Sequence, residues 1–367
     1  MKKILAFMVA LVVIGVAEAA RSADSSGLKQ GAPDLMSAGP LAFAPGGILL
    51  VGDTKAAAIF AIDTGDKTGD PKKVEIKIEG LQQKLADLLA SSAPQIQVND
   101  MAVNPASGNV YLSVSYGTSP ASAIVKIDSA NKITKLDLAK IGFSKAVLPN
   151  APEDKVVGEG RRQANRRNES ITDLAYVNGQ VIVSGLSSAA APSTVRALAF
   201  PFVDADPGMS LEIYHGAHGK LEDYAPIRTF VPMTINGEAT ILAGFTCTPL
   251  VRIPLSSITA GKKTRGTTVA ELGNRNKPLD MIHYEKDGKE YLLMANSARG
   301  VMKISTENID RKEGIENPVK SEREGQAYET IESLKGTVQL DRLNDKNAIV
   351  IIQVEGGPMD IRTVPLP

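Results

Sequence analysis

Apolar and polar residues alternate in short runs along most of this chain, and the stretch from Asn99 to Leu138 shows the pattern most clearly. Its apolar runs are rich in β-branched residues and are bounded by Gly, Pro, Asn and Ser, which is typical of strands joined by tight turns. One antiparallel four-stranded sheet of this size is one blade of a β-propeller, because a lone sheet leaves both of its faces uncovered. The four predicted strands are Met101–Val103, Val110–Val114, Ala123–Ile127 and Ile133–Leu138.

A similar series of three strands recurs along the chain. Self-similarity at a long period is typical of repeat architectures. We therefore predict an all-β fold, a β-propeller of six four-stranded blades, with residues 20–367 forming one domain. A seventh blade hidden in the longer inserts is the alternative. The six copies begin at GPLAF (Gly39), NDMAV (Asn99), ITDLAY (Ile171), TFVPM (Thr229), PLDMI (Pro278) and GTVQL (Gly336).

The last copy and three inserts depart from this repeat. The sixth copy stops after its third strand, so we expect a strand from Gly27–Met36 to complete this blade and remove an exposed sheet edge. The alternative is that Ser22–Ala32 is a disordered leader. Leucines at helical spacing predict a short amphipathic helix over Leu81–Ser91. The other two inserts, Phe143–Ser170 and Thr306–Ser333, are long enough to be functional or disordered loops.

The first 19 residues have the features of a secretory signal peptide. Lys2 and Lys3 precede an uncharged apolar run over Ile4–Val16, and Ala17-Glu18-Ala19 fits an A-x-A cleavage site. The apolar run is too short to span a bilayer comfortably. We expect cleavage after Ala19 and export to the periplasm or the exterior. The expected product is a monomer with no integral membrane segment.

Charge and composition exclude several classes of function. The chain carries 41 basic and 41 acidic residues, so it has no bulk attraction for nucleic acid. Four arginines in the Phe143–Ser170 insert lack the interleaved aromatic residues of a nucleic-acid site. Cys247 is the sole cysteine, so an internal disulfide is impossible. The four arginines are Arg161, Arg162, Arg166 and Arg167.

His215, His218 and Cys247 form the sharpest local group of metal-binding residue types. The two histidines flank a Gly-Ala pair, and the only thiol is expected in the same blade neighbourhood. Imidazole and thiolate ligands favour copper or zinc over calcium. The alternative is that the histidines are surface loop residues and Cys247 is a small buried apolar residue.

Carboxylates recur at the start of the first strands, which line the central channel of a propeller. Asp100, Asp173 and Asp280 could ring the channel mouth and, together with Asn99 and Asp53, bind calcium or another hard cation through oxygen ligands. The alternative is that each aspartate binds loop amides and acts as a structural fastening. Arg299 follows a tight turn and is a candidate clamp for a carboxylate or phosphate.

The motif NPASGNVYLSVSYG followed by SAIVKID resembles exported bacterial β-propellers of the broad YVTN/NHL and WD40-like grouping. The Gly-His and Trp-Asp signatures of true WD40 repeats are absent from the sequence. The resemblance implies a propeller over nearly the whole mature chain. It does not select a function, because this grouping includes binding scaffolds, lactonases and accessory subunits of periplasmic redox enzymes.

Two classes of function follow. The first is a binding or scaffold module that takes a protein partner or a small ligand on its loop-rich rim. The second is a metal-dependent hydrolase of lactonase type, with channel aspartates as ligands and Asp53 as a base. A copper-binding accessory to a periplasmic redox enzyme is a variant between them. A hydrolase requires carboxylates that converge on one cation, whereas a scaffold has them bound to backbone amides.

Overall fold

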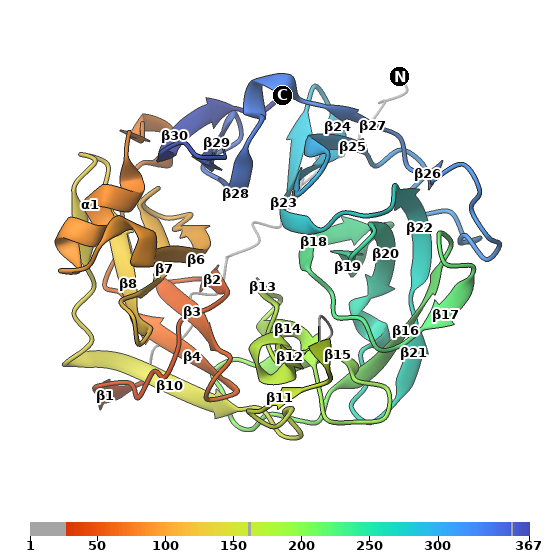
Figure 1. Ribbon diagram of the computed structural model, residues 1–367, viewed down its shortest axis with the longest axis horizontal. Helices are drawn as coiled ribbons and strands as arrows, with labels where there is room; N and C mark the ends of the chain where they lie inside the picture. Colours follow the sequence, from red (N-terminus) through yellow and green to blue (C-terminus); the bar gives the residue numbers. More distant parts are fainter. Residues whose placement is uncertain (1–26, 161–162, 354) are drawn as a thin grey trace, which may run out of the picture.

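The computed structural model describes residues 27–160, 163–353 and 355–367. The predicted signal peptide and Arg161 and Arg162 lie outside the described residues. Six sheets stand side by side in a ring around a central channel, as predicted (Figure 1). Among the described residues, no helix is both long and apolar enough to cross a bilayer.

Each blade presents one strand to the channel, and the next strands follow outward by short antiparallel turns. The innermost strands are β2 (Leu41–Ala44), β6 (Ile96–Val103), β13 (Asp173–Val177), β18 (Thr229–Ile235), β23 (Pro278–Lys286) and β28 (Thr337–Arg342). The second strands are β3 (Ile48–Asp53), β7 (Val110–Tyr116), β14 (Gln180–Leu186), β19 (Glu238–Gly244), β24 (Lys289–Asn296) and β29 (Asn347–Gln353). The third strands are β4 (Ala58–Asp63), β8 (Ala121–Ile127), β15 (Ser193–Ala199), β20 (Pro249–Pro254), β25 (Gly300–Ser305) and β30 (Met359–Pro365).

The outer strands are shorter and several come from distant parts of the chain. Four of them follow their own blade in sequence, namely β9 (Ile133–Lys135), β16 (Met209–His215), β22 (Thr267–Leu272) and β27 (Tyr328–Thr330). The first blade is instead completed by β10 (Ile141–Val147), which pairs with β4 only after the chain has built the second blade. Further short strands at sheet edges are β17 (Lys220–Glu222), β21 (Lys263–Arg265) and β26 (Arg323–Gly325).

The strand that completes the sixth blade differs from the expected one. β30 pairs with β5 (Lys77–Ile78), whereas β1 (Lys29–Gly31), from the expected N-terminal segment, pairs with β10 at the outer edge of the first blade. The side chains of Ile76 and Ile78 are buried in the core beneath this edge, and that burial holds β5 in place. The edge of the sixth blade is therefore covered without the N-terminal segment.

The order of blades around the ring differs from their order in sequence. The second blade, which begins with β6, stands between the first and the sixth (Figure 1). Its position follows from the path of the chain, which leaves β4, adds β5 to the sixth blade, forms α1 (Leu81–Leu88) and only then enters β6. The predicted helix is confirmed, and it buries Leu81 and Leu85 against the second and sixth blades.

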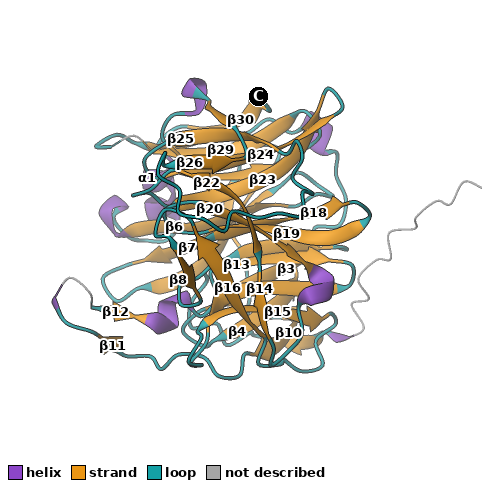
Figure 2. Cartoon of the chain, turned by 90° about the vertical axis from the view of Figure 1, so that its right-hand side faces the viewer, coloured by secondary structure: helices purple, strands orange, loops and turns teal. Residues whose placement is uncertain are grey.

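The Phe143–Ser170 insert is only partly a loop. Its first residues continue β10, and later residues form a two-stranded hairpin, β11 (Val156–Val157) and β12 (Ala164–Asn165), which extends from the body of the molecule (Figure 2). The Arg167 guanidinium donates to the carbonyl oxygens of Pro152 (2.5 Å) and Lys55 (3.2 Å). Arg167 therefore folds the insert back onto the first blade.

Candidate functional site

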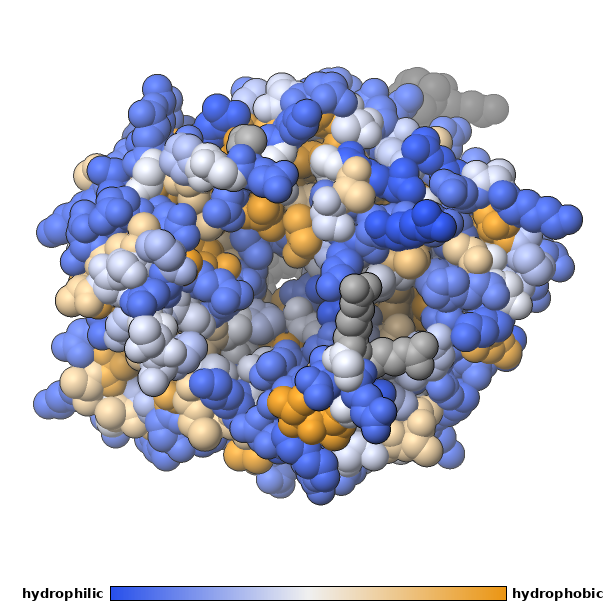
Figure 3. All heavy atoms as spheres, in the orientation of Figure 1, coloured by the Kyte–Doolittle hydropathy of each residue, from blue (hydrophilic) through white to orange (hydrophobic). Residues whose placement is uncertain are grey.

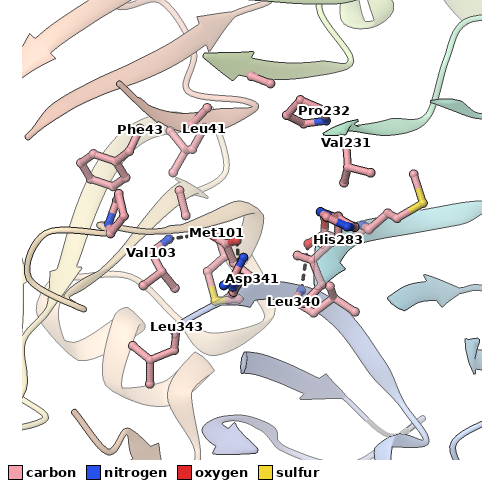
Figure 4. Close-up of a pocket in the computed structure, with 18 of the residues that line it drawn as sticks. Leu41, Phe43, Met101, Val103, Val231, Pro232, His283, Leu340, Asp341 and Leu343 are labelled. Carbon is pink, nitrogen blue, oxygen red and sulfur yellow. Dashed lines mark hydrogen bonds between the residues drawn. The ribbon is translucent and has the colours of Figure 1, made fainter. Parts of the chain in front are cut away.

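The central channel contains a cavity of about 660 Å³ lined by all six innermost strands (Figure 4). Its opening is visible in the middle of the ring in the space-filling view (Figure 3). Apolar side chains such as Leu41, Met101 and Val231 form much of its wall. The loops that reach it are those at Pro105 and Asn344, after β6 and β28, and the segment at Pro71 between β4 and β5; they lie opposite the rim where the second-to-third strand loops gather.

Four aspartates face this cavity, three of them predicted from sequence. Asp100, Asp173 and Asp280 stand on β6, β13 and β23, and Asp341 on β28 is the one that the sequence pattern missed. In β6 and β23 the strand register shifts just before the aspartate. Such a bulge redirects the side chain that follows it, so the local irregularity places these carboxylates in the channel.

Each of the four carboxylates accepts a hydrogen bond from the backbone of a neighbouring blade. Each also accepts one from the amide of the residue that follows it in sequence, Met101, Leu174, Met281 or Arg342. The carboxylates therefore fasten blade to blade around the channel, which agrees with the structural alternative considered for them. The pairs between blades are Leu41 N to Asp100 (2.6 Å), Phe230 N to Asp173 (2.6 Å), Leu340 N to Asp280 (2.8 Å) and Val103 N to Asp341 (2.7 Å).

Gln339 takes the equivalent place in the sixth blade, because β28 has the same register shift just before it. With its amide turned to satisfy both neighbours, its Nε2 donates to Asp280 Oδ2 and Asp100 Oδ1, each at 2.9 Å. One amide therefore bridges two carboxylates across three blades. It relieves part of the repulsion between them.

Burial dominates the protonation of this ring. It raises the pKa of Asp100 well above the ordinary value, and the Asp173 charge adds to the effect. Burial and then the Asp100 charge raise the pKa of Asp280 in the same way. Burial also raises the pKa of Asp173 to about 7 and that of Asp341 to about 6, although their amide hydrogen bonds act in the opposite direction. The channel therefore holds protons near neutral pH.

Asp53 lies outside this ring, at the end of β3. Its buried carboxylate accepts hydrogen bonds from Met36 N (2.6 Å), Ser37 Oγ (2.6 Å) and Ala56 N (2.9 Å). These contacts anchor the segment that leads into the first blade. Asp53 is not among the residues that line the channel cavity, so the geometry gives it no role there as a base or a calcium ligand.

The two histidines predicted to bind metal do lie together, at the turn between β16 and β17. His215 Nδ1 is 3.0 Å from Glu222 Oε2, His218 Nδ1 is 2.7 Å from Glu222 Oε1, and the two rings stack with centroids 3.8 Å apart. Burial disfavours the charged form of Glu222, but hydrogen bonds from His215, His218 and Tyr224 lower its pKa to about 2. Glu222, seven residues after His215, was not predicted from the sequence as part of this group.

Cys247 and Arg299 do not join either group. Among the described residues, the potential ligand atoms that gather are those of His215, His218 and Glu222, without the thiol. Cys247 Sγ instead accepts a weak hydrogen bond from Arg275 N (3.4 Å). Arg299 packs over Gly273 and donates to Asn274 O (3.3 Å), away from the channel cavity, so it does not clamp a ligand there.

No family model and no curated protein matches the chain. It is similar to a solved structure of a putative oxidoreductase (glucose dehydrogenase) from Thermus thermophilus, at 12% identity and TM-score 0.34, covering 92% of this chain and 100% of the other. It is similar to streptogramin B lyase at 9% identity and TM-score 0.36, covering 92% and 97%. It is also similar to the WD40 β-propeller domain of Doa1 at 7% identity and TM-score 0.31, covering 91% and 95%. Likenesses this weak assign no function, and the narrower YVTN/NHL grouping stays a prediction.

Proposed function

We propose that this propeller is a binding protein that takes a small organic cation into its central channel. The observation that carries the proposal is the cavity of about 660 Å³, with apolar side chains in its wall and four aspartates on the innermost strands that line it. Small-molecule sites are typically cavities of ~300–1,000 Å³, mostly apolar, with a few polar groups that fix orientation. The channel has a volume in this range, with apolar side chains and carboxyl groups side by side in its lining.

The charge of the lining selects the class of ligand. Six carboxylates line the cavity, against two permanently charged bases, Lys72 and Arg342. An amine with an apolar body would place its cation among the aspartates and its body against residues such as Leu41 and Val231. An anion would meet like charge at the carboxylates that are ionised at neutral pH, of which Asp341 is one because burial raises its pKa only to about 6. Cation entry would favour the ionised carboxylates, so binding would release protons.

The channel supports a binding role better than the rim. Asp53 and Arg299, the rim residues expected to bind a ligand, make their contacts within the protein. The lactonase-type alternative needs carboxylates that converge on one cation. Within the described part of the chain, no three channel carboxylates lie within 4.8 Å of one another.

The test compares three probes of the same shape, namely benzylamine, benzyl alcohol and benzoate, by isothermal titration calorimetry. We expect benzylamine to bind best and its affinity to fall about tenfold in Asp341→Asn, the loss of roughly one charge interaction of 1.4 kcal/mol. Asp137→Asn is the matched control, because this exposed carboxylate caps a turn outside the channel. Thermal unfolding of both variants checks that the fold is retained. Equal affinity for the three probes, or unchanged benzylamine binding in Asp341→Asn, would contradict the proposal.

A further inference from the structure

A second site, distinct from the channel, is indicated by the group at the β16–β17 turn. It lies on the outer part of the third blade, and its members come from the end of β16, the turn and the end of β17. His215 and Glu222 are buried, with 2% and 4% of their surface exposed, whereas the His218 side chain is 43% exposed. The group is therefore held by the protein on one side and reachable from solvent on the other.

The turn that carries the histidines is rigid. His218 N donates to His215 O (3.1 Å) and Gly219 N to Gly216 O (3.1 Å), so the four residues close a compact turn. Glu271 on β22 accepts a hydrogen bond from Gly216 N at 2.6 Å and fixes the turn from beneath. The two imidazoles are therefore positioned before any ligand arrives.

One nitrogen of this group is left without a role in the protein alone. His215 Nε2 is buried and has no hydrogen-bond partner among the residues that the structure describes. A buried polar atom without a partner costs roughly 1–3 kcal/mol. An atom of this kind calls for an explanation, and a bound water or ion is one. Glu222 therefore fixes the His215 ring through Nδ1, while Nε2 has no hydrogen-bond partner among the described residues.

We propose that His215, His218 and Glu222 bind one divalent transition-metal ion, zinc or copper. One ligand atom from each residue lies within 4.8 Å of the other two. The Nδ1 to carboxylate distances of 3.0 and 2.7 Å are slightly shorter than the separation of about 3.3 Å between ligands around a tetrahedral ion with bonds of ~2.0–2.1 Å. Each ring would coordinate through Nδ1 as a neutral imidazole with its proton on Nε2, and the ion would replace the hydrogen bonds to Glu222 with a small outward movement of the side chains.

The donor set decides the class of metal. Two imidazoles and one carboxylate suit zinc and copper, whereas calcium and magnesium prefer oxygen ligands alone. Three protein ligands leave a fourth position, and the exposure of His218 places that position toward solvent. Lys220 Nζ, 3.7 Å from Glu222 Oε1, is the nearby cation that an ion would push outward.

The test is equilibrium dialysis of the purified protein against zinc and, separately, copper, with bound metal measured by mass spectrometry. We expect one ion per wild-type chain and an affinity at least about tenfold lower in His218→Ala and Glu222→Gln. His218 is exposed, so its removal leaves the core intact, which circular dichroism verifies. His283→Ala removes the third histidine, which pairs with Glu290 in another blade, and is the matched control. Cys247→Ala is the second control.

The outcomes separate the proposed ligand set from its rivals. Unchanged binding in both control variants, with loss in His218→Ala and Glu222→Gln, supports the site. Substitution with cobalt adds a spectroscopic readout, because a thiolate ligand gives a charge-transfer band that the proposed set lacks. Absence of binding to the wild type, retention in His218→Ala, or loss or a thiolate band that depends on Cys247 would each overturn the proposal.

Discussion

At the scale of single residues, carboxylates of this protein repeatedly accept hydrogen bonds from distant parts of the chain. Asp53 holds the N-terminal segment, and the channel aspartates hold neighbouring blades. Asp66, after β4, is the most fully engaged, because Ser107 Oγ, Asn109 Nδ2 and Tyr111 Oη all donate to it at 2.9 Å. Burial disfavours its charged form, but these donors and Lys126 lower its pKa overall.

Replacing Asp66 tests how much such a carboxylate contributes to the stability of the fold. Asp66→Ala leaves three donors of the second blade without their shared acceptor, so we expect a loss of about 3 kcal/mol in the free energy of unfolding. Urea denaturation measures it. Asp63→Ala is the control, because the Asp63 contact with Lys67 is a surface ion pair (3.2 Å) worth less than about 1 kcal/mol. Equal losses of unfolding free energy in the two variants would show that the shared acceptor contributes no more stability than a surface ion pair.

Individual residues could be placed from the sequence where their position in the repeat determines which way the side chain points. Asp100, Asp173 and Asp280 were expected at the channel because they begin first strands. Asp341 was missed because Gln339 occupies the equivalent place in its blade, two residues earlier. Cys247 was grouped with the histidines by blade neighbourhood, but it lies in a loop between middle strands, whereas His215 ends an outermost strand.

At the scale of elements, the three inner strands of every blade could be predicted, whereas among the outer strands only β9 was, from the run Ile133–Leu138. The second strands, such as β3 and β14, are buried along almost their whole length and are therefore apolar runs, and each innermost strand precedes one of them at a short, regular spacing. The outer strands β5 and β27 have only two and three residues and little apolar signal. β5 also belongs to a blade that begins more than 200 residues later, and nothing local in the sequence indicates that partner.

The attachment of β5 gives a test at this scale. Ile76, 1% exposed, precedes β5, and its backbone is bonded to Thr363 through Ile76 N to Thr363 Oγ1 and Thr363 N to Ile76 O, each at 2.8 Å. Ile76→Ala should lower the free energy of unfolding by about 2–4 kcal/mol and speed hydrogen exchange at the Thr363 amide. The exposed Lys77→Ala is the control. Unaltered exchange at Thr363 in Ile76→Ala would show that β30 does not depend on this edge.

At the scale of the whole molecule, ring closure is shared among several parts of the chain. The second blade is inserted between the first and the sixth, β5 completes the sixth, and β10 returns to complete the first. β5 and β10 thus each join a sheet whose other strands are distant in sequence. The contacts that close the ring bring together residues such as Val103 and Asp341. The predicted number of blades is confirmed, whereas their order around the ring could not be predicted, because inner strands carry no signal of which neighbour they face.

The aspartates at the centre of this ring make the stability of the molecule depend on pH. In an unfolded chain an aspartate has a pKa of about 3.9, whereas burial raises the pKa of Asp173 to about 7 and those of Asp100 and Asp280 well above their ordinary value. The folded protein therefore binds more protons than the unfolded one near neutral pH. This stabilising effect is complete below about pH 4 and is lost as the pH rises through the folded-state values.

We therefore expect the free energy of unfolding to fall between pH 6.5 and 8.5, with a slope of about 1.4 kcal/mol per pH unit for each carboxyl group that is still protonated in the folded state. The lowered pKa values of His215 and His283 act in the opposite direction, and this contribution disappears above about pH 7.5, where the unfolded-state histidines are largely neutral. Glu271, whose pKa burial raises to about 7, adds to the same trend.

Asp173→Asn isolates the channel, because an amide cannot ionise. Urea denaturation across this range should give a smaller slope for Asp173→Asn than for the wild type, while Asp137→Asn keeps the full slope. A wild-type stability that is constant or rises with pH would mean that the channel carboxylates are already ionised in the folded protein.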